Sequence, residues 1–300
     1  MDGGSFAEVE DRIAKVEGHV GIACKQLGGP GKEYYHNADY VFPSASTFKV
    51  FILAEIMRRA CQGQINLEDT YTLKNDDWCP GSGVLRELTP GTGISLYDLC
   101  VFMIIISDNS ATDICLEIAG IDNVAKLLER AGCQQTSVPM GCKGILAHFA
   151  GIPVKWPTHQ QCMEATERIR RGAVDDQGLA FAGSTENVVT TARDMSRFLE
   201  QLSSHRNVFS ECTSRRSISV LKRQRLSQRI PSRLPADVVV AHKTGTLRGP
   251  KVAVHNDAGI VYPDGNVPYV LSIYTAIRSG SEDGDELVAE LSQLLYRLMT

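Results

Sequence analysis

The sequence predicts an α+β protein, in which an antiparallel sheet with flanking terminal helices accompanies a helical lobe. Two observations support this prediction. Segments with strand character lie near the two ends of the chain, whereas the middle contains mainly segments with helical periodicity. The elements also occur in runs of one type and do not alternate, as strands and helices would in a parallel α/β fold.

The first sixty or so residues are predicted to form a helix, a strand and a second helix. Apolar residues at helical spacing place the first helix at about residues 5–17, and Gly18 ends it. Residues 19–27 have strand character and lead into a glycine-rich turn around Pro30. The second helix covers about residues 46–60 and is apolar nearly all round, so we expect it to be buried.

The middle of the chain is predicted to be helical. The expected helices cover residues 97–106, 111–119, 122–129 and 191–202. A basic stretch from Ser214 to Arg233 follows. We interpret it as a solvated helix face or loop, because acidic residues elsewhere balance its charge.

The C-terminal region is predicted to return to strands and to end in a helix. The expected strands cover residues 237–242, 257–262 and 268–276, and the expected helix covers residues 286–298. We therefore expect one lobe built from residues 1–45 and 211–300 and a helical lobe built from residues 46–210. A small-molecule site is expected in the cleft between the two lobes.

The composition fits a globular protein that binds neither nucleic acid nor membranes. Hydrophobic residues make up 43% of the 300 residues, which is enough for a sizeable core. The formal net charge of −4 gives no basic footprint for nucleic acid. The longest apolar run, Leu99–Ile106, is too short to span a bilayer, and the first residues lack the features of a signal peptide. We expect a cytoplasmic monomer.

The nine cysteines are scattered and include no C-x-x-C pair. Cys24, Cys100 and Cys115 lie inside apolar runs. We therefore expect free, buried thiols, which fit a reducing compartment. The spacing fits no metal site, so no metal and no cofactor is expected.

Three short motifs carry the residue types needed for nucleophilic catalysis. They are Ser46-Thr47-Phe48-Lys49, Ser107-Asp108-Asn109 and Lys243-Thr244-Gly245. A serine hydroxyl needs a neighbouring base, and a lysine three residues later lies on the same helix face. Burial and the positive helix N-terminus disfavour an ammonium there and so favour a basic lysine. Each motif alone also fits a structural interpretation, namely a helix cap, a capping turn or a strand end.

In this order, and with a hydrophobic helix behind the first, the motifs resemble those of class A β-lactamases and penicillin-binding proteins. The resemblance implies a β-lactamase/transpeptidase-like fold with its active site between two lobes. It also implies that Ser46 is the nucleophile, that Lys49 and Ser107 move protons, and that Asp108 holds the second motif in place.

The same resemblance assigns the substrate contacts. It implies that Asn109 binds a substrate amide and that Lys243 and Thr244 bind a substrate carboxylate. The backbone N–H groups of Thr246 and of the nucleophile would form the oxyanion hole, which is worth roughly 3–4 kcal/mol per donor. The substrate is therefore expected to be a small anionic molecule.

A loop before the second motif is expected at the rim of the cleft. Trp78 and Ser82 lie in this loop, and for both a substrate contact and a purely structural role stay open. His242 and His255 are interpreted as structural residues.

One element of the family pattern is missing. Family β-lactamases carry a glutamate and an asparagine, separated by three residues, on a loop that positions the deacylating water. No such pair occurs between residues 141 and 186. The acids available there are Glu164, Glu167, Asp175, Asp176 and Glu186. Asp176 is the preferred candidate for a general base, and the alternative that none of them serves stays open.

The expected activity is that of a serine hydrolase that forms an acyl-enzyme with β-lactams or related amides. Two alternatives stay open. The first is an esterase, peptidase or acyltransferase that acts on another acyl substrate. The second is a penicillin-binding sensor that is acylated without turnover, and the missing glutamate favours it.

Overall fold

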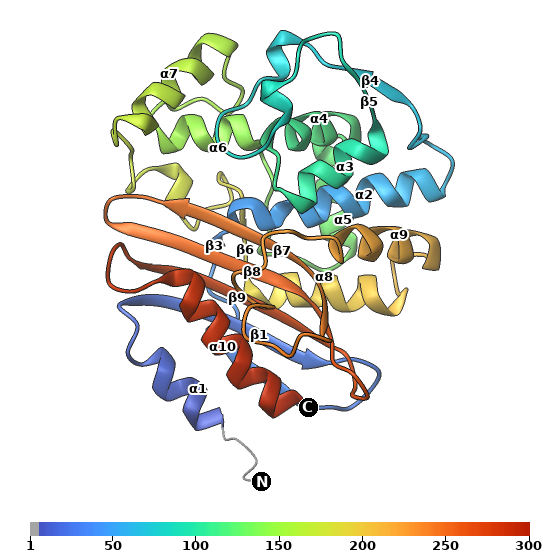
Figure 1. The fold of residues 1–300 in the computed structure, drawn as a ribbon, viewed down its shortest axis with the longest axis vertical. Coiled ribbons are helices and arrows are strands. Elements are labelled where there is room, and N and C mark those ends of the chain that lie inside the picture. The colour runs from blue at the N-terminus through green and yellow to red at the C-terminus, as the bar shows by residue number, and fades with distance from the viewer. Residues whose placement is uncertain (1–5) are drawn as a thin grey trace.

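The computed structural model describes residues 6–300, whose main sheet is covered by helices on both faces (Figure 1). The sheet has five antiparallel strands in the order β2-β1-β9-β8-β7. They are β1 (Gly18–Gln26), β2 (Glu33–His36), β7 (Val239–Arg248), β8 (Val252–Tyr262) and β9 (Tyr269–Arg278). The N-terminal hairpin thus pairs with the C-terminal strands, as the sequence predicts.

The predicted helices occur in the predicted order, and two further helices between residues 142 and 170 were not predicted. They are α1 (Phe6–Ile13), α2 (Lys49–Cys61), α3 (Leu96–Ile105), α4 (Asn109–Ala119), α5 (Ile121–Arg130), α6 (Cys142–Phe149), α7 (His159–Arg170), α8 (Ala192–Ser204), α9 (Glu211–Leu221) and α10 (Gly284–Met299). Two short ribbons pair β3 (Phe42–Pro43) with β6 (Val189–Thr190) and β4 (Thr70–Thr72) with β5 (Gly93–Ser95). Within residues 6–300, no helix combines the length and the apolar character needed to cross a bilayer.

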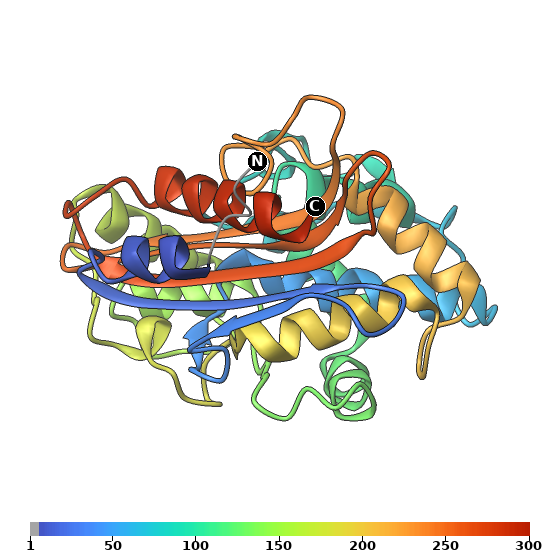
Figure 2. The same cartoon turned by 90° about the horizontal axis from the view of Figure 1, so that it is seen from below.

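The terminal helices α1 and α10 cover one face of the sheet, and α8 lies against the other (Figure 2). Apolar side chains of β1 and β9, such as Ile22 and Leu271, pack against Leu287 and Leu291 of α10. Helix α10 begins after Asp283, whose carboxylate accepts hydrogen bonds from the N–H groups of Asp285 and Glu286, the second and third residues of the helix. This cap anchors the helix at one end of the sheet.

The second core lies between the sheet and the helical layer formed by α2 to α9. Phe51 of α2 and Phe198 of α8 meet edge to face in this core, with ring centroids 4.8 Å apart. Helix α8 lies in the range expected for the helical lobe, yet it packs on β1, β8 and β9. Helix α9 lies in the range expected for the lobe that contains the sheet, yet it packs on α2 and α3 as well as on β7. Both helices therefore join the two layers near the expected boundary at residue 210.

Strands β7 and β8 are longer than the sequence predicts. The prediction ended the first strand at residue 242 and began the second at residue 257, because the residues between are largely polar. In the fold, Asn256 and Asp257 are fully buried and hydrogen-bonded, and His242 bonds to Asp257 through Nδ1 at 2.9 Å. Satisfied polar groups can be buried in a sheet, so strand periodicity alone misses such a segment.

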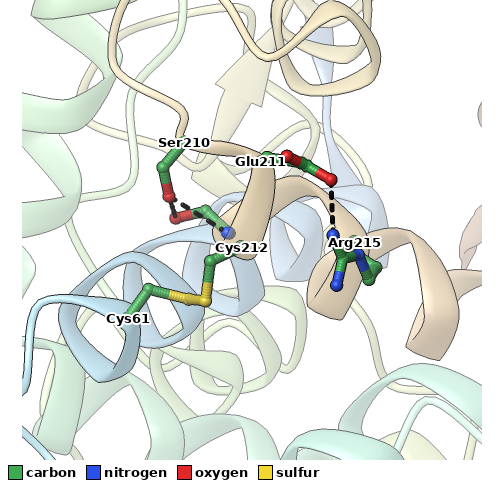
Figure 3. The surroundings of a disulfide bond; sticks show 6 residues. Cys61, Ser210, Glu211, Cys212 and Arg215 are labelled. Carbon is green, nitrogen blue, oxygen red and sulfur yellow. Dashed lines mark hydrogen bonds and ion pairs between the residues drawn. A yellow bond between two sulfur atoms is a disulfide. The ribbon is translucent and has the colours of Figure 1, made fainter.

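The expectation that all cysteines are free is wrong for two of them. Cys61, the last residue of α2, forms a disulfide with Cys212 near the start of α9 (Figure 3). The other seven cysteines are free and buried, as expected. The two partners are 151 residues apart in sequence, so no local spacing reveals the pair. The cysteine pattern therefore no longer favours a reducing compartment.

Candidate active site

Ser46 lies in a single 3₁₀ turn, Ala45–Phe48, that leads directly into α2. Ala45 before it has φ = +46°, a left-handed conformation that a non-glycine residue adopts only under constraint. The constraint comes from the sheet. Asn256 of β8 donates from Nδ2 to the Pro43 carbonyl at 2.9 Å, and the Thr47 hydroxyl bonds to that of Tyr274 at 2.9 Å. These contacts fix the turn, and with it the serine, against the sheet.

Lys49 joins the first motif to the second. Its side chain is fully buried, and Nζ donates to the Ser107 carbonyl at 2.8 Å, to Ser107 Oγ at 3.1 Å and to Asn109 Oδ1 at 2.8 Å. Ser107 has φ = +58°, which turns its backbone at the end of α3. These three acceptors hold the Nζ atom of Lys49 in one position.

Asp108 holds the second motif in place, in the manner that the resemblance implies. It caps α4 by accepting the Ala111 N–H at 2.9 Å, and its Oδ2 accepts the N–H groups of Val84 and Leu85 at 2.6 and 2.9 Å. The carboxylate therefore ties the rim loop to the motif. Gly83 in that loop approaches Asp108 so closely that a Cβ would lie 2.3 Å from the carboxylate.

The rim loop places one of its two candidate residues in the site. Ser82 donates to the Ser107 carbonyl at 2.7 Å and lines the same cavity as Ser46. Trp78 lines a different cavity, where its ring meets that of His159 edge to face. Ser82 is therefore placed to contact a ligand beside Ser46, whereas Trp78 is not.

The third motif lies inside β7 and not at a strand end. Lys243 is fully buried and donates to Ser107 Oγ at 3.1 Å and to the Thr244 carbonyl at 2.7 Å. Burial, and secondarily the charge of Lys49, hold the pKa of Lys243 well below its usual range. The Ser107 hydroxyl therefore lies between two lysine amines, and the environment of one of them disfavours a second positive charge.

Gly245 allows β7 to approach the turn that carries Ser46. A Cβ at this position would lie 2.8 Å from the Ser44 carbonyl oxygen and 2.9 Å from the Ser46 nitrogen. Strand β7 is at the edge of the sheet, and Thr244 and Thr246 lie on one side of it because their spacing is two. Both threonines line the cavity with Ser46.

Arg229 was not identified from the sequence, where it belonged to the stretch interpreted as solvated. It is 4% exposed and donates to the Gly245 carbonyl at 2.8 Å and to Thr246 Oγ1 at 2.5 Å. Oδ1 of Asp285 lies 2.8 Å from Nε of Arg229, so the carboxylate balances the charge of the guanidinium. The solvated interpretation is therefore wrong for this residue. Its partners are distant in sequence, so no local pattern could have revealed them.

The motifs enclose a cavity of about 250 Å³. Its lining residues are Ala45, Ser46, Phe48, Gly81, Ser82, Ser107, Asn109, Cys142, Ile145, Leu146, Leu226, Thr244, Thr246 and Leu247. Lys49 and Lys243 are not on this surface and lie behind Ser107. One side of the cavity is thus polar, and the other is formed by aliphatic side chains and a thiol.

The cavity lining, as far as residues 6–300 define it, includes no carboxylate. Asp176, the preferred candidate for a general base, instead accepts the Lys251 N–H at 2.5 Å in the β7–β8 hairpin. Asp175 accepts the Gln177 N–H at 3.1 Å. Glu164 and Glu167 form ion pairs with arginines of their own helix or its end. The same part of the chain contains no group of three His, Cys, Asp or Glu side chains suited to a metal ion.

Comparison with known proteins points to one family. The family model described as the beta-lactamase enzyme family matches residues 5–299. A beta-lactamase of Bacteroides uniformis is 25% identical, over 98% of this chain and 92% of its own length. The crystal structure of a beta-lactamase from Sphaerobacter thermophilus is 23% identical, with a TM-score of 0.79 and 98% coverage of both chains.

A penicillin-binding protein shares the fold as well. A mutant of PBP-A, solved as an acyl-enzyme complex with penicillin G, is 20% identical to this chain. The TM-score is 0.73, and the match covers 96% of this chain and 94% of that one. The chain is therefore similar in fold both to a beta-lactamase and to a penicillin-binding protein.

Proposed function

The chain belongs to the beta-lactamase enzyme family and has its fold, and from this premise we propose that it is a serine acyl-transfer enzyme. Ser46 would attack the carbonyl carbon of a β-lactam or a related amide. One observation carries the proposal. The amines of Lys49 and Lys243 both lie 3.1 Å from Ser107 Oγ, behind a cavity that Ser46 lines.

The proposed acylation step moves one proton from the nucleophile to the leaving nitrogen. Lys49 accepts the proton of Ser46 as Oγ bonds to the carbonyl carbon. The backbone N–H groups of Ser46 and Thr246 would stabilise the resulting oxyanion. The C–N bond then breaks, and Ser107 Oγ donates a proton to the nitrogen. Ser107 regains a proton from a lysine amine at 3.1 Å, which leaves an ester on Ser46.

The substrate class follows from the polar side of the cavity. Thr244 and Thr246 offer hydroxyl groups, and the amine of Lys243 and the buried guanidinium of Arg229 lie directly behind them. This arrangement favours a carboxylate or another small anion on the substrate. The cytoplasmic location and the monomeric state stay predictions from the sequence.

A second candidate function is a penicillin-binding sensor that is acylated without turnover. The absence of a carboxylate from the lining that residues 6–300 provide favours it, because hydrolysis of the ester needs a base for water. An esterase, peptidase or acyltransferase that acts on another acyl substrate is a further alternative within the same chemistry.

Covalent labelling tests the proposal. The intact protein is incubated with a chromogenic cephalosporin and with neutral esters, and its mass is followed over time. We expect one added acyl group on the peptide that contains Ser46. The variant Ser46→Ala should keep its thermal stability and lose the adduct. An adduct that persists in Ser46→Ala would overturn the assignment of the nucleophile.

A further inference from the structure

A second cavity lies beside helix α4 and is separate from the cavity that contains Ser46. Its volume is about 290 Å³, and the two cavities share no lining residue. Helices α4 and α6, which pack on each other in the helical layer, contribute residues to both (Figure 1). The proposed acyl transfer makes no use of this second cavity, so its lining has to be interpreted on its own chemistry.

The charged groups of this lining are mainly negative. They are the carboxylates of Asp77, Asp113 and Glu117 and the amine of Lys143. The Lys143 amine donates to the carbonyl of Asp76, and within residues 6–300 it forms no ion pair with any of the three carboxylates. The lining therefore carries an excess of negative charge that its own lysine does not pair with.

Asp113 is the carboxylate that would gain most from a cation. It accepts the Cys142 N–H at 2.5 Å and the Lys143 N–H at 3.0 Å, and so caps α6. Within the described part of the chain, no cationic side chain forms an ion pair with it. Burial raises the pKa of Asp113, although the two N–H groups act in the opposite direction. A desolvated carboxylate without a cationic partner is costly, so a cation that enters the cavity would be stabilised there.

The other walls of the cavity are apolar. Ile114 and Leu116 are buried, and Ile121 is half-buried. Trp156 also lines the cavity and is 64% exposed, so its ring is free to contact a ligand. The face of an indole ring attracts cations and accepts apolar groups. Within residues 6–300 no group of side chains is suited to a metal ion, so the lining favours an organic cation.

We propose that this cavity binds a small organic cation, namely a primary amine that carries an aromatic ring or a short alkyl chain. Its ammonium group lies near Asp113 and Glu117, and its apolar part lies against Ile114 and Trp156. A volume of about 290 Å³ accommodates one molecule of this size. An anion would be repelled by the carboxylates, and a neutral molecule of the same shape would leave Asp113 without a cation.

Calorimetric titration with three probes of similar shape tests the proposal. Benzylammonium, benzyl alcohol and benzoate differ mainly in charge and are compared at one ionic strength. We expect benzylammonium to bind at a single site, about tenfold or more tightly than either other probe, because charge-assisted hydrogen bonds are the strong ones. Equal affinities for benzylammonium and benzyl alcohol would overturn the proposal, as would no binding of benzylammonium at millimolar concentration.

Exposed residues of the lining provide variants that should remain folded. Glu117→Gln should weaken benzylammonium binding about threefold or more, and Trp156→Leu about fivefold or more. Lys143→Met should strengthen binding, because it removes a like charge. The matched control is Glu129→Gln, which neutralises an exposed carboxylate outside the lining and should change nothing. Equal binding in Glu117→Gln and Glu129→Gln would contradict the proposed position of the ammonium group.

The two tryptophans of the chain allow the site to be located. Trp78 lines a different cavity, so Trp78→Phe leaves Trp156 as the only indole. In this variant benzylammonium should change the tryptophan emission, with saturation at the concentration found by calorimetry. Unchanged emission at saturation would place the amine elsewhere and overturn the proposal. None of these measurements involves acylation, so their outcome is independent of the proposed function.

Discussion

The Ser107 hydroxyl, placed between two lysine amines, determines the charge balance of the site. Two ammonium groups so close together in a buried place would repel each other. Within residues 6–300, the structure supplies acceptors for each amine but no carboxylate among their hydrogen-bond partners. Neutralising one amine relieves the repulsion, which is why the pKa of Lys243 is lowered by burial and then by Lys49. A neutral amine is also the form able to accept a proton.

This shift predicts a pH dependence of stability. Below pH 10.5 an unfolded Lys243 holds a proton that the folded protein binds less readily. The penalty for protonating Lys243 in the folded protein is therefore absent above pH 10.5. It grows, and stability falls, as the pH falls toward the folded pKa. The free energy of unfolding should rise with pH by up to about 1.4 kcal/mol per unit from this group. In Lys243→Met this part of the slope should vanish. Urea unfolding of both proteins between pH 7 and pH 10 measures it, and equal slopes would contradict the shift.

The motif residues could be predicted from the sequence because each motif is local. Ser46 and Lys49 share one turn, and the Ser-Asp-Asn triplet forms a single cap. The structure places both motifs and Thr244 around one cavity. Arg229 and Cys142 could not be predicted in the same way. Arg229 is held at the site by hydrogen bonds to β7, and Cys142 by a hydrogen bond to α4. Both elements are distant in sequence from the residue that they hold, and neither residue type indicates a role by itself.

A disulfide bond joins helices α2 and α9 of the helical layer. The Cys61–Cys212 disulfide joins the C-terminal end of α2, whose N-terminal end follows Ser46, to the start of α9 (Figure 3). The loop after α9 carries Leu226 and Arg229. The bond therefore restrains two elements that both lead to residues of the cavity lining.

Removing the disulfide should lower stability and spare the chemistry. A disulfide that closes a long loop contributes about 2–4 kcal/mol, so Cys61→Ser and Cys212→Ser should each melt several degrees lower. Labelling of Ser46 at 25 °C should be unchanged in both. Thiol titration of the denatured, unreduced protein should find seven thiols, and nine after reduction. Nine thiols before reduction would show that the bond does not form.

At the level of elements, long helices and strands with clear periodicity could be predicted. The helices expected at 97–106, 111–119 and 122–129 correspond to α3, α4 and α5. Helix α6 and the first half of β8 were missed because tertiary contacts stabilise them. Asp113 caps the first, and buried hydrogen bonds hold the second. Such contacts join distant segments, so a local pattern does not contain them.

The whole molecule places the edge strand β7 against the nucleophile and helix α6 on the aliphatic side of the cavity. The sheet fixes Ser46 through Asn256 and Tyr274, while α6 is fixed from the helical layer through Asp113. The nucleophile and the aliphatic side of the cavity are therefore held by different parts of the fold.

Pre-steady-state kinetics with penicillin G tests the central claim, acylation of Ser46 in a site that lacks a deacylating base. Product release and intact mass are followed on the unchanged protein from milliseconds to hours. We predict a burst of one acyl group per protein, followed by slow turnover with the acyl-enzyme as the dominant species. Linear, rapid turnover without a burst or a visible acyl-enzyme, or no adduct at any time, would contradict the account.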